Sequence, residues 1–281
     1  MLPARGFAIA LLVVFAPGIA AAADMSPPPP AMPAAATPAA KPDWQVTLGG
    51  VAEIGPAFPG APSSDMGFWG WPIIGVQKPG TRPDFFGGRD SASVSILDLG
   101  TLKIGPAGKW IQERREASYA ALQGLGDVPY AVQIGGFAEY WAVPWLRLRG
   151  EVRQGFNGEK GVTGDLFADF VANVGQWRAS VGPRATFQST AAISPYFDVT
   201  ASQSALSGLP QYSSSGGFYS WGVGGQLDYF FNNQWAVYGL VEYERISDSA
   251  AGSPIVTVRG SPNQLTFGLG ASYTFTMHPL W

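Results

Sequence analysis

Residues 146–153, LRLRGEVR, decide the fold class because they alternate strictly between two kinds of side chain. Successive side chains of a strand point to opposite faces, so one face receives apolar or small residues and the other receives charges. The charged positions are Arg147, Arg149, Glu151 and Arg153. A charge at mid-bilayer costs roughly 2–4 kcal/mol in a barrel, so four charges cannot face lipid. We predict that this strand turns its charged face inward or toward water.

The same period of two recurs along most of the chain. Residues 69–77 and 91–99 alternate less regularly, and Pro72 within the first of these indicates a weak strand or a bulge. Residues 102–110 and 195–201 predict two further, short strands. The clearest alternating segments are residues 44–54, 128–141, 165–174, 177–188, 219–231, 235–244 and 265–275. We predict an all-β, transmembrane, antiparallel up-and-down β-barrel of about 12 strands, with 10 or 14 as alternatives.

Composition agrees with a strand-built membrane protein. Charged residues make up 13% of the 281-residue chain, well below the roughly 25% of soluble domains. Aromatic residues also make up 13%, and many end the apolar faces, as in the interfacial girdles of barrels. The alternative is a soluble sandwich or lipocalin-like barrel, but charge ladders in a chain so poor in charge argue against it.

The two ends of the chain predict processing and export. Residues 1–23 combine Arg5, an apolar run and a small-residue cleavage site, which is typical of a signal peptide; an uncleaved anchor is the alternative. Residues 24–43 are rich in proline and alanine and predict a disordered leader, either a spacer or a tether. Residues 44–275 would form the barrel and residues 276–281 a short tail. Either Phe275 or Trp281 would be the terminal aromatic read during assembly.

An even number of strands places both termini in the periplasm. Residues 231–234 then form a short periplasmic turn, and residues 55–65, 202–216 and 247–263 become outer loops. Residues 112–127 form a long connection that this count places on the periplasmic side. Either the count is wrong by one strand there, or this is a periplasmic excursion.

Five short motifs are spread along the chain: GGVAEIGPAFPG at 49–60, LQGLGD at 122–127, VRQ at 152–154, YFDVT at 196–200 and DSAAGSPIV at 248–256. In this order and spacing they resemble motifs of the MipA/OmpV outer-membrane proteins. In YFDVT, Asp198 stands where the family usually has glycine. The resemblance covers roughly residues 44–275, and the chain continues beyond Phe275 where the family usually stops.

This resemblance implies a bacterial outer-membrane protein with protein partners. The family's name-giving protein interacts with a lytic transglycosylase and is thought to scaffold it with a murein synthase. The expected partners are therefore these two enzymes, outer-membrane lipid and lipopolysaccharide, and the barrel-assembly machinery during insertion. A small-solute channel with a charged lumen, or a surface adhesin, are the alternatives. The absence of a basic stripe argues against nucleic acid.

The charged face predicts a network inside the barrel. Three interpretations remain open: a structural network, an anion-selective pore lining, or a binding site for an acidic ligand. Its predicted members are Arg147, Arg149, Glu151, Arg153, Asp165, Asp169, Arg178, Arg184, Asp228, Glu242 and Glu244.

Catalysis is not expected. The chain has no cysteine, and its single histidine, His278, lies in the tail, so neither a Ser–His–Asp triad nor a zinc site is expected. Glu242 and Glu244, approached by Glu139 or Glu151, could form a catalytic carboxylate pair, but pairing with lumen arginines is the expected role. We expect no cofactor and no enzymatic activity.

Overall fold

The computed structural model describes residues 44–77 and 85–277. The expected signal peptide, the leader and His278 to Trp281 lie outside the described residues. Among the described residues, no helix is both long and apolar enough to cross a membrane.

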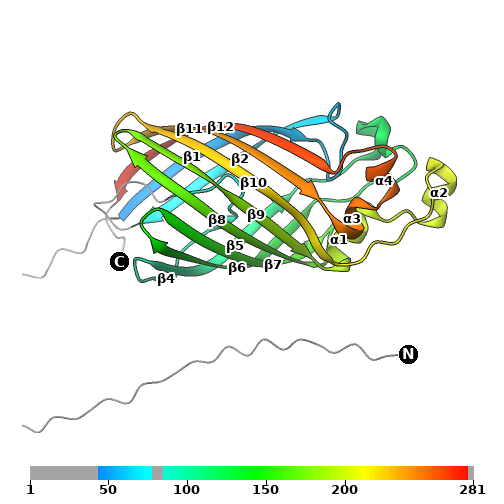
Figure 1. The fold of residues 1–281 in the computed structure, drawn as a ribbon, viewed down its shortest axis with the longest axis horizontal. Helices are drawn as coiled ribbons and strands as arrows, with labels where there is room; N and C mark the ends of the chain where they lie inside the picture. The colour runs from blue at the N-terminus through cyan, green and yellow to red at the C-terminus, as the bar shows by residue number, and fades with distance from the viewer. Residues whose placement is uncertain (1–43, 78–84, 278–281) are drawn as a thin grey trace, which may run out of the picture. The chain divides into compact units, whose positions relative to one another are not determined.

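In the described part of the chain, twelve strands form one sheet, which curls into a barrel (Figure 1). The strands are β1 (Trp44–Pro56), β2 (Met66–Gln77), β3 (Ala92–Ser93), β4 (Leu97–Asp98), β5 (Leu102–Ile111), β6 (Ala131–Val143), β7 (Leu146–Asn157), β8 (Val162–Val174), β9 (Trp177–Gln188), β10 (Gly217–Phe230), β11 (Trp235–Ile246) and β12 (Asn263–Met277). Every ladder is antiparallel, and the order is β2-β1-β12-β11-β10-β9-β8-β7-β6-β5-β3, with β4 beside β5. The predicted barrel architecture is therefore confirmed.

One end of the barrel carries helices and the other carries tight turns. The helices are η1 (Glu116–Ser118), η2 (Ala120–Leu122), α1 (Thr190–Phe197), α2 (Ala201–Ser207), α3 (Asp248–Ala251) and α4 (Pro254–Thr257). We call this the helical end, and the opposite end, with turns at residues 99–101, 144–145, 175–176 and 231–234, the hairpin end (Figure 1). At the helical end Phe58, Leu122, Leu209 and Ile255 pack in one apolar cluster.

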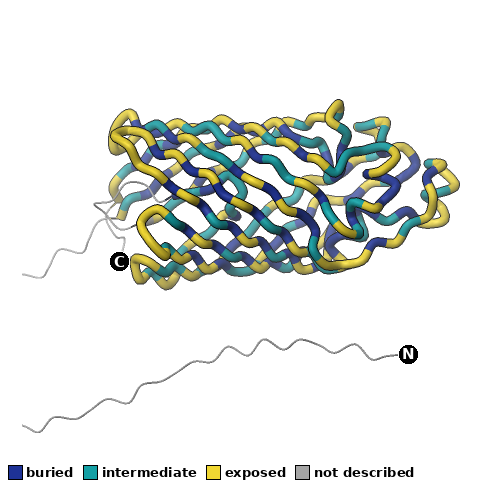
Figure 2. Tube along the Cα trace, viewed as in Figure 1, coloured by how far each residue is buried: buried dark blue, intermediate teal, exposed yellow. Residues whose placement is uncertain are grey.

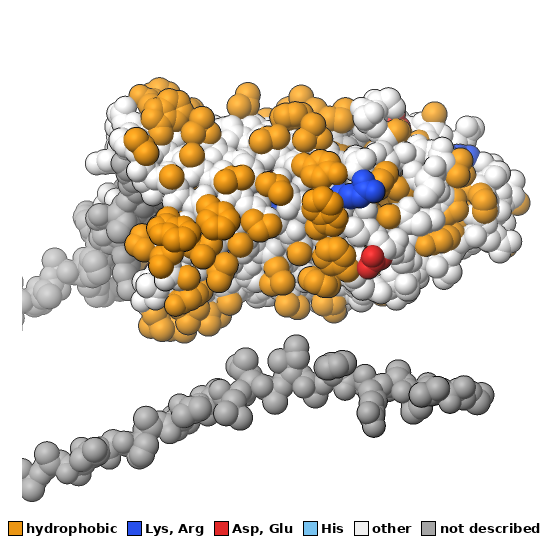
Figure 3. All heavy atoms as spheres, viewed as in Figure 1, with side chains coloured by type: hydrophobic (Ala, Val, Ile, Leu, Met, Phe, Trp, Pro, Cys, Tyr) orange, Lys and Arg blue, Asp and Glu red, His pale blue; other side chains and the backbone are white. Residues whose placement is uncertain are grey.

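Burial alternates along the strands, as Figure 2 shows. In β7 the charged positions are buried, whereas Leu148 and Val152 are exposed on the outside. Figure 3 shows one face of the barrel, where hydrophobic side chains are scattered over the strands and charged ones are few. A barrel with an apolar exterior and a charged interior is suited to lipid around it.

Aromatic pairs lie near both ends of the wall. Near the hairpin end Trp177 packs on Tyr229 and Trp235 on Tyr273. Near the helical end the rings of Trp110 and Tyr130 stack 4.5 Å apart. Two aromatic belts are typical of the interfaces of a membrane barrel.

Residues 195–201 were predicted to be a strand, and that prediction is wrong. They lie at the end of α1 and the start of α2. Thr200 caps α2 with its side chain, because its hydroxyl accepts from the Gln203 N–H while the Gln203 side chain accepts from the Thr200 N–H.

For residues 112–127 the structure decides between the two alternatives: the strand count was wrong by one at this point. This connection lies at the helical end, where Leu122 and Leu125 join the cluster that includes Phe58. The reason lies in residues 85–91, the described part of the connection between β2 and β3, which run inside the barrel; we call them the inner strap. Because the strap adds a pass that is not a wall strand, β3 runs in the same direction as β2, and β5 ends at the helical end.

The wall is therefore interrupted between β2 and β3. The described residues carry no ladder between these two strands, although the strands are in contact. β2 is an edge strand whose ladder partner is β1, and Pro72 lies opposite Gly50 in that ladder. An edge strand tolerates a proline because it needs ladder hydrogen bonds on one side only.

The last strand closes the barrel against the first. β12 continues two residues beyond Phe275, and Trp44 pairs with Met277. The tail expected from residue 276 is thus part of the strand as far as Met277.

Candidate site in the barrel lumen

The charged ladder of β7 lies inside the barrel and is almost fully buried. Arg147 is 0% exposed, and Arg149, Glu151 and Arg153 are each at most 5% exposed. The alternation of β7 explains this placement, since every second side chain points inward. Buried charges are tolerated only where they are paired, and these are.

Arg147 is the centre of the pairing. Its guanidinium contacts the carboxylates of Asp90 on the strap, Glu139 on β6 and Asp169 on β8, the last at 2.8 Å. Asp169 also forms an ion pair with Arg184 on β9, at 2.6 Å. One arginine thus connects three wall strands and the strap.

The other β7 charges extend this network toward the helical end. Arg149 contacts Glu139 at 3.3 Å and Glu151 at 2.8 Å. Arg153 contacts Glu151 and also Asp165 on β8. Of the predicted site residues, the structure joins seven in this cluster, which we call the paired half of the lumen: Arg147, Arg149, Glu151, Arg153, Asp165, Asp169 and Arg184.

The remaining four predicted residues lie in two separate groups. Arg178 and Asp228 face each other across β9 and β10, with a contact of 2.8 Å. Glu242 and Glu244 on β11 do not reach the paired half. Instead they share Arg89 of the strap, at 2.8 and 3.2 Å.

The strap therefore crosses the lumen between two walls. Asp90 contacts Arg147 on β7, while its neighbour Arg89 contacts β11 on the other side. Ser91 donates to Glu151, and the Phe85 ring lies 5.1 Å from the Arg147 guanidinium carbon. These contacts hold the strap in place by charge on both sides.

Sequence reasoning missed Arg89, Asp90 and Glu139 as members of the network. Glu139 lies on the polar face of its alternating segment, so its inward position could have been included. Arg89 and Asp90 follow Gly87 and Gly88 in a stretch without a period of two, so no strand signal marked them.

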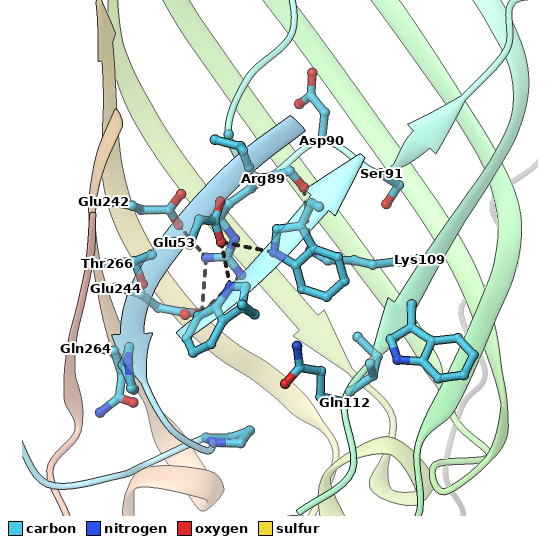
Figure 4. A pocket seen from close by; sticks show the side chains of 18 of the residues that line it. Glu53, Arg89, Asp90, Ser91, Lys109, Gln112, Glu242, Glu244, Gln264 and Thr266 are labelled. Atoms are coloured by element: carbon cyan, nitrogen blue, oxygen red, sulfur yellow. Dashed lines mark hydrogen bonds and ion pairs between the residues drawn. The ribbon is translucent and has the colours of Figure 1, made fainter. Parts of the chain in front are cut away.

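A cavity of about 420 Å³ occupies the other side of the lumen, toward the helical end (Figure 4). We call this region the cavity half. In it, Glu53 of β1 accepts hydrogen bonds from the indole nitrogens of Trp69 at 2.7 Å and Trp71 at 3.1 Å. The Lys109 ammonium donates to the Arg89 carbonyl oxygen at 3.5 Å. The further polar lining includes Arg89, Glu242, Glu244, Gln264 and Thr266.

Two buried side chains at the helical end of this cavity keep polar atoms without a hydrogen-bond partner. They are the Tyr196 hydroxyl and the Arg114 Nε, both on residues that line the cavity. Burial lowers the pKa of Arg114 to about 10, which leaves it protonated at neutral pH, and burial raises the pKa of Tyr196. Both side chains are 4% exposed.

Within the described residues no group of three or more histidine, cysteine, aspartate or glutamate side chains is arranged to hold a metal ion. Glu242 and Glu244 are neighbours on one face, but both are engaged by the same arginine, as the expected lumen pairing requires.

Comparison with known proteins gives a family and a set of barrels. The family model described as "MltA-interacting protein MipA" matches residues 48–275. No curated protein matches the chain. Among solved structures, an outer membrane channel from Pseudomonas putida F1 is similar at 11% identity, covering 87% of this chain and 100% of that one, with a TM-score of 0.44. The outer membrane protein OprG from Pseudomonas aeruginosa is similar at 13% identity, covering 84% and 97%, with a TM-score of 0.27. At these identities and TM-scores neither similarity bears on ligand or partner.

Proposed function

The chain belongs to the MipA family of bacterial outer-membrane β-barrels, and from that premise we propose that it is an interaction protein for peptidoglycan-remodelling enzymes. Its partners would be a lytic transglycosylase of the MltA kind and, through it, a murein synthase. The family's name, which refers to an interaction with MltA, supports this partner.

The packed lumen is the observation that carries the proposal. Arg147 is fully buried among three carboxylates, and the inner strap crosses the lumen from β7 to β11. A wide aqueous pore needs an unobstructed lumen, as in large porins. A barrel filled by its own charges is better suited to presenting a rigid surface.

The hairpin end is the surface that we assign to the partner. Short turns and chain termini of outer-membrane barrels lie on the periplasmic side, where peptidoglycan is. Both the first residue of β1 and the last residue of β12 lie at this end. The tight turn at residues 231–234 is exposed there.

Site-specific photocrosslinking in intact cells tests the proposal. A photoreactive amino acid at Gln176 or Asn233, both in hairpin-end turns, should capture MltA, identified by mass spectrometry. The same amino acid at Gln203, on α2 at the helical end, is the matched control and should not. Capture of MltA from none of the three positions, or from Gln203 alone, would refute the assignment.

The alternative function, a small-solute channel, is supported by the cavity in the lumen and can be tested separately. Single-channel recording of the purified barrel should show no large steady conductance. A steady conductance would instead favour the small-solute channel.

A further inference from the structure

We propose that the cavity half opens sideways to the membrane, through the interruption between β2 and β3, and binds a small amphipathic amine. This inference goes beyond the proposed partner interaction and does not depend on it. The argument uses the wall positions that line the cavity, its aromatic surface and its charge.

The cavity lining includes residues from both faces of the wall. Glu53, Trp69 and Trp71 point into the lumen. Ala92 on β3 and Trp110 on β5, by contrast, are at exposed, outward positions, yet they line the same cavity. Because inward and outward side chains alternate, one cavity lined by both must pass through the wall.

The passage lies where the wall is interrupted. The outward residue Pro72 of β2 also lines the cavity, so lining residues come from both edges of the interruption. Elsewhere in the described barrel, consecutive strands in the sheet order are joined by ladders. The interruption faces the hydrocarbon layer, since the outward side chains beside it include Val94 and Ile96, which are apolar and exposed.

The walls of the cavity suit an apolar chain. Indole rings and the aliphatic side chains of Val51, Ile73 and Leu240 line it. A volume of about 420 Å³ lies within the roughly 300–1,000 Å³ of small-molecule sites. The occupant that fits is therefore small, with an apolar body that reaches the cavity from the bilayer.

The charged lining of the cavity favours an amine as the polar head group of this ligand. Its charged lining includes the carboxylates of Glu53, Asp90, Glu242 and Glu244 and the cations of Arg89, Lys109 and, at the helical end, Arg114. Glu242 and Glu244 share the Arg89 guanidinium, whereas Glu53 has two indole donors and no ion-pair partner among the described residues. Glu53 is thus a buried carboxylate without an opposite charge beside it.

An unmatched buried charge favours a ligand of opposite sign. Indole faces also attract cations, so the tryptophans that fix Glu53 add to this preference. At the helical end the unpartnered Tyr196 hydroxyl offers a further polar contact. A carboxylate ligand of the same length would meet a like charge at Glu53.

Calorimetric titration of the purified full-length protein in lipid nanodiscs tests the proposal with octylamine and octanoate as probes. Octylamine should bind, and octanoate should bind at least about tenfold more weakly. Glu53→Gln keeps an acceptor for the two indole N–H groups but removes the negative charge. In this variant the affinities for octylamine and octanoate should become about equal. Equal binding of the two probes, or no binding of octylamine, would overturn the amine assignment.

The sideways opening is tested by a bulky side chain at its edge. Ala92→Trp should slow the association of octylamine by about tenfold, whereas Ala179→Trp, at an outward position of β9, should leave it unchanged. Association as fast in Ala92→Trp as in the wild type would refute entry between β2 and β3. Circular dichroism and heat-modified migration of both variants show whether each is folded.

Discussion

The paired half and the cavity half of the lumen are built from the same residue types but solve burial differently. In the paired half Arg147, Arg149 and Arg153 each meet two or more carboxylates, and Arg184 meets that of Asp169. In the cavity half Glu53 has only indole donors, and Lys109 meets a single carbonyl oxygen. Ion-paired side chains fill the paired half, whereas the cavity half, where pairing is incomplete, keeps space for a ligand.

This difference indicates that charged residues inside a barrel can have two roles, stabilisation of the fold and binding of a ligand. Where opposite charges are mutually saturated, their removal should destabilise the fold. Where they are not saturated, their removal should alter binding and leave the fold intact. Each prediction below tests one side of this contrast against the other.

Arg147→Ala should have the largest effect. It leaves three buried carboxylates without their shared cation, and breaking a buried ion pair from one side costs roughly 3–5 kcal/mol. We expect the free energy of unfolding in urea, measured in lipid vesicles by tryptophan fluorescence, to fall by about that amount. Glu53→Gln in the cavity half is the control, with an expected loss under about 1 kcal/mol. Equal losses in the two variants would remove the distinction between the halves.

Added methyl groups should be tolerated unequally. In Gly182→Ala, on β9 of the paired half, the new Cβ would meet the backbone carbonyl oxygen of Ala168. In Gly88→Ala, on the strap beside the cavity, it would lie 2.9 Å from the Leu240 side chain, which can move. Overpacking costs about 1–3 kcal/mol, so Gly182→Ala should lose that much and Gly88→Ala less than about 1 kcal/mol. Thermal unfolding monitored by circular dichroism ranks the two, and a reversed order would contradict the contrast.

Arg89→Met probes the boundary between the halves. It leaves Glu242 and Glu244 side by side without their cation, but the Arg89 side chain is 21% exposed, so water screens part of the repulsion. We expect a loss of about 1 kcal/mol in urea unfolding and stronger binding of octylamine in the calorimetric titration. Weaker octylamine binding would show that Arg89, rather than the carboxylates, holds the ligand.

Glu159, in the loop between β7 and β8, should give the smallest effect. Burial raises the pKa of this carboxyl, whereas Gln133, Arg153 and Lys109 act in the opposite direction. A raised folded-state pKa means that protonation favours the folded state. The contribution of Glu159 is therefore fully present below its ordinary pKa of about 4.3 and is lost as pH rises through the raised value.

Urea midpoints of the wild type and Glu159→Gln between about pH 4 and 7 isolate this contribution. The midpoint of the wild type should decrease relative to that of the variant as pH rises. A difference that does not change with pH would mean that the carboxyl titrates alike in the folded and unfolded chains.

Strand-level expectations were most accurate where a period of two was strict. The inward position of the β7 charges follows from alternation alone, whereas the register that opposes Arg147 to Asp169 also depends on the connection between β7 and β8. The contacts of Arg89 and Asp90 could not be predicted, because a strap inside a barrel has no wall periodicity and follows two glycines.

The two topology errors have distinct causes. Residues 196–200, YFDVT, alternate like a strand, although Thr200 and Gln203 carry a capping-box signal that indicates a helix start nearby. Because the strap was not recognised, the prediction lacked one crossing of the chain from one end of the barrel to the other. The false strand at residues 195–201 added one such crossing. The errors cancel after α2, so the directions of β10 to β12 were predicted correctly while those of β3 to β9 were reversed.

The interruption between β2 and β3 also limits how this barrel can change over evolutionary time. β3 and β4 both pair with β5, so the wall has an odd number of positions, eleven, and at least one pair of neighbours must run in the same direction. Duplication or loss of a hairpin alters the wall by two strands and preserves that parity. No such event can close the interruption. Gain of one strand, for instance by movement of the strap into the wall, would close the interruption and would also remove the strap from the lumen.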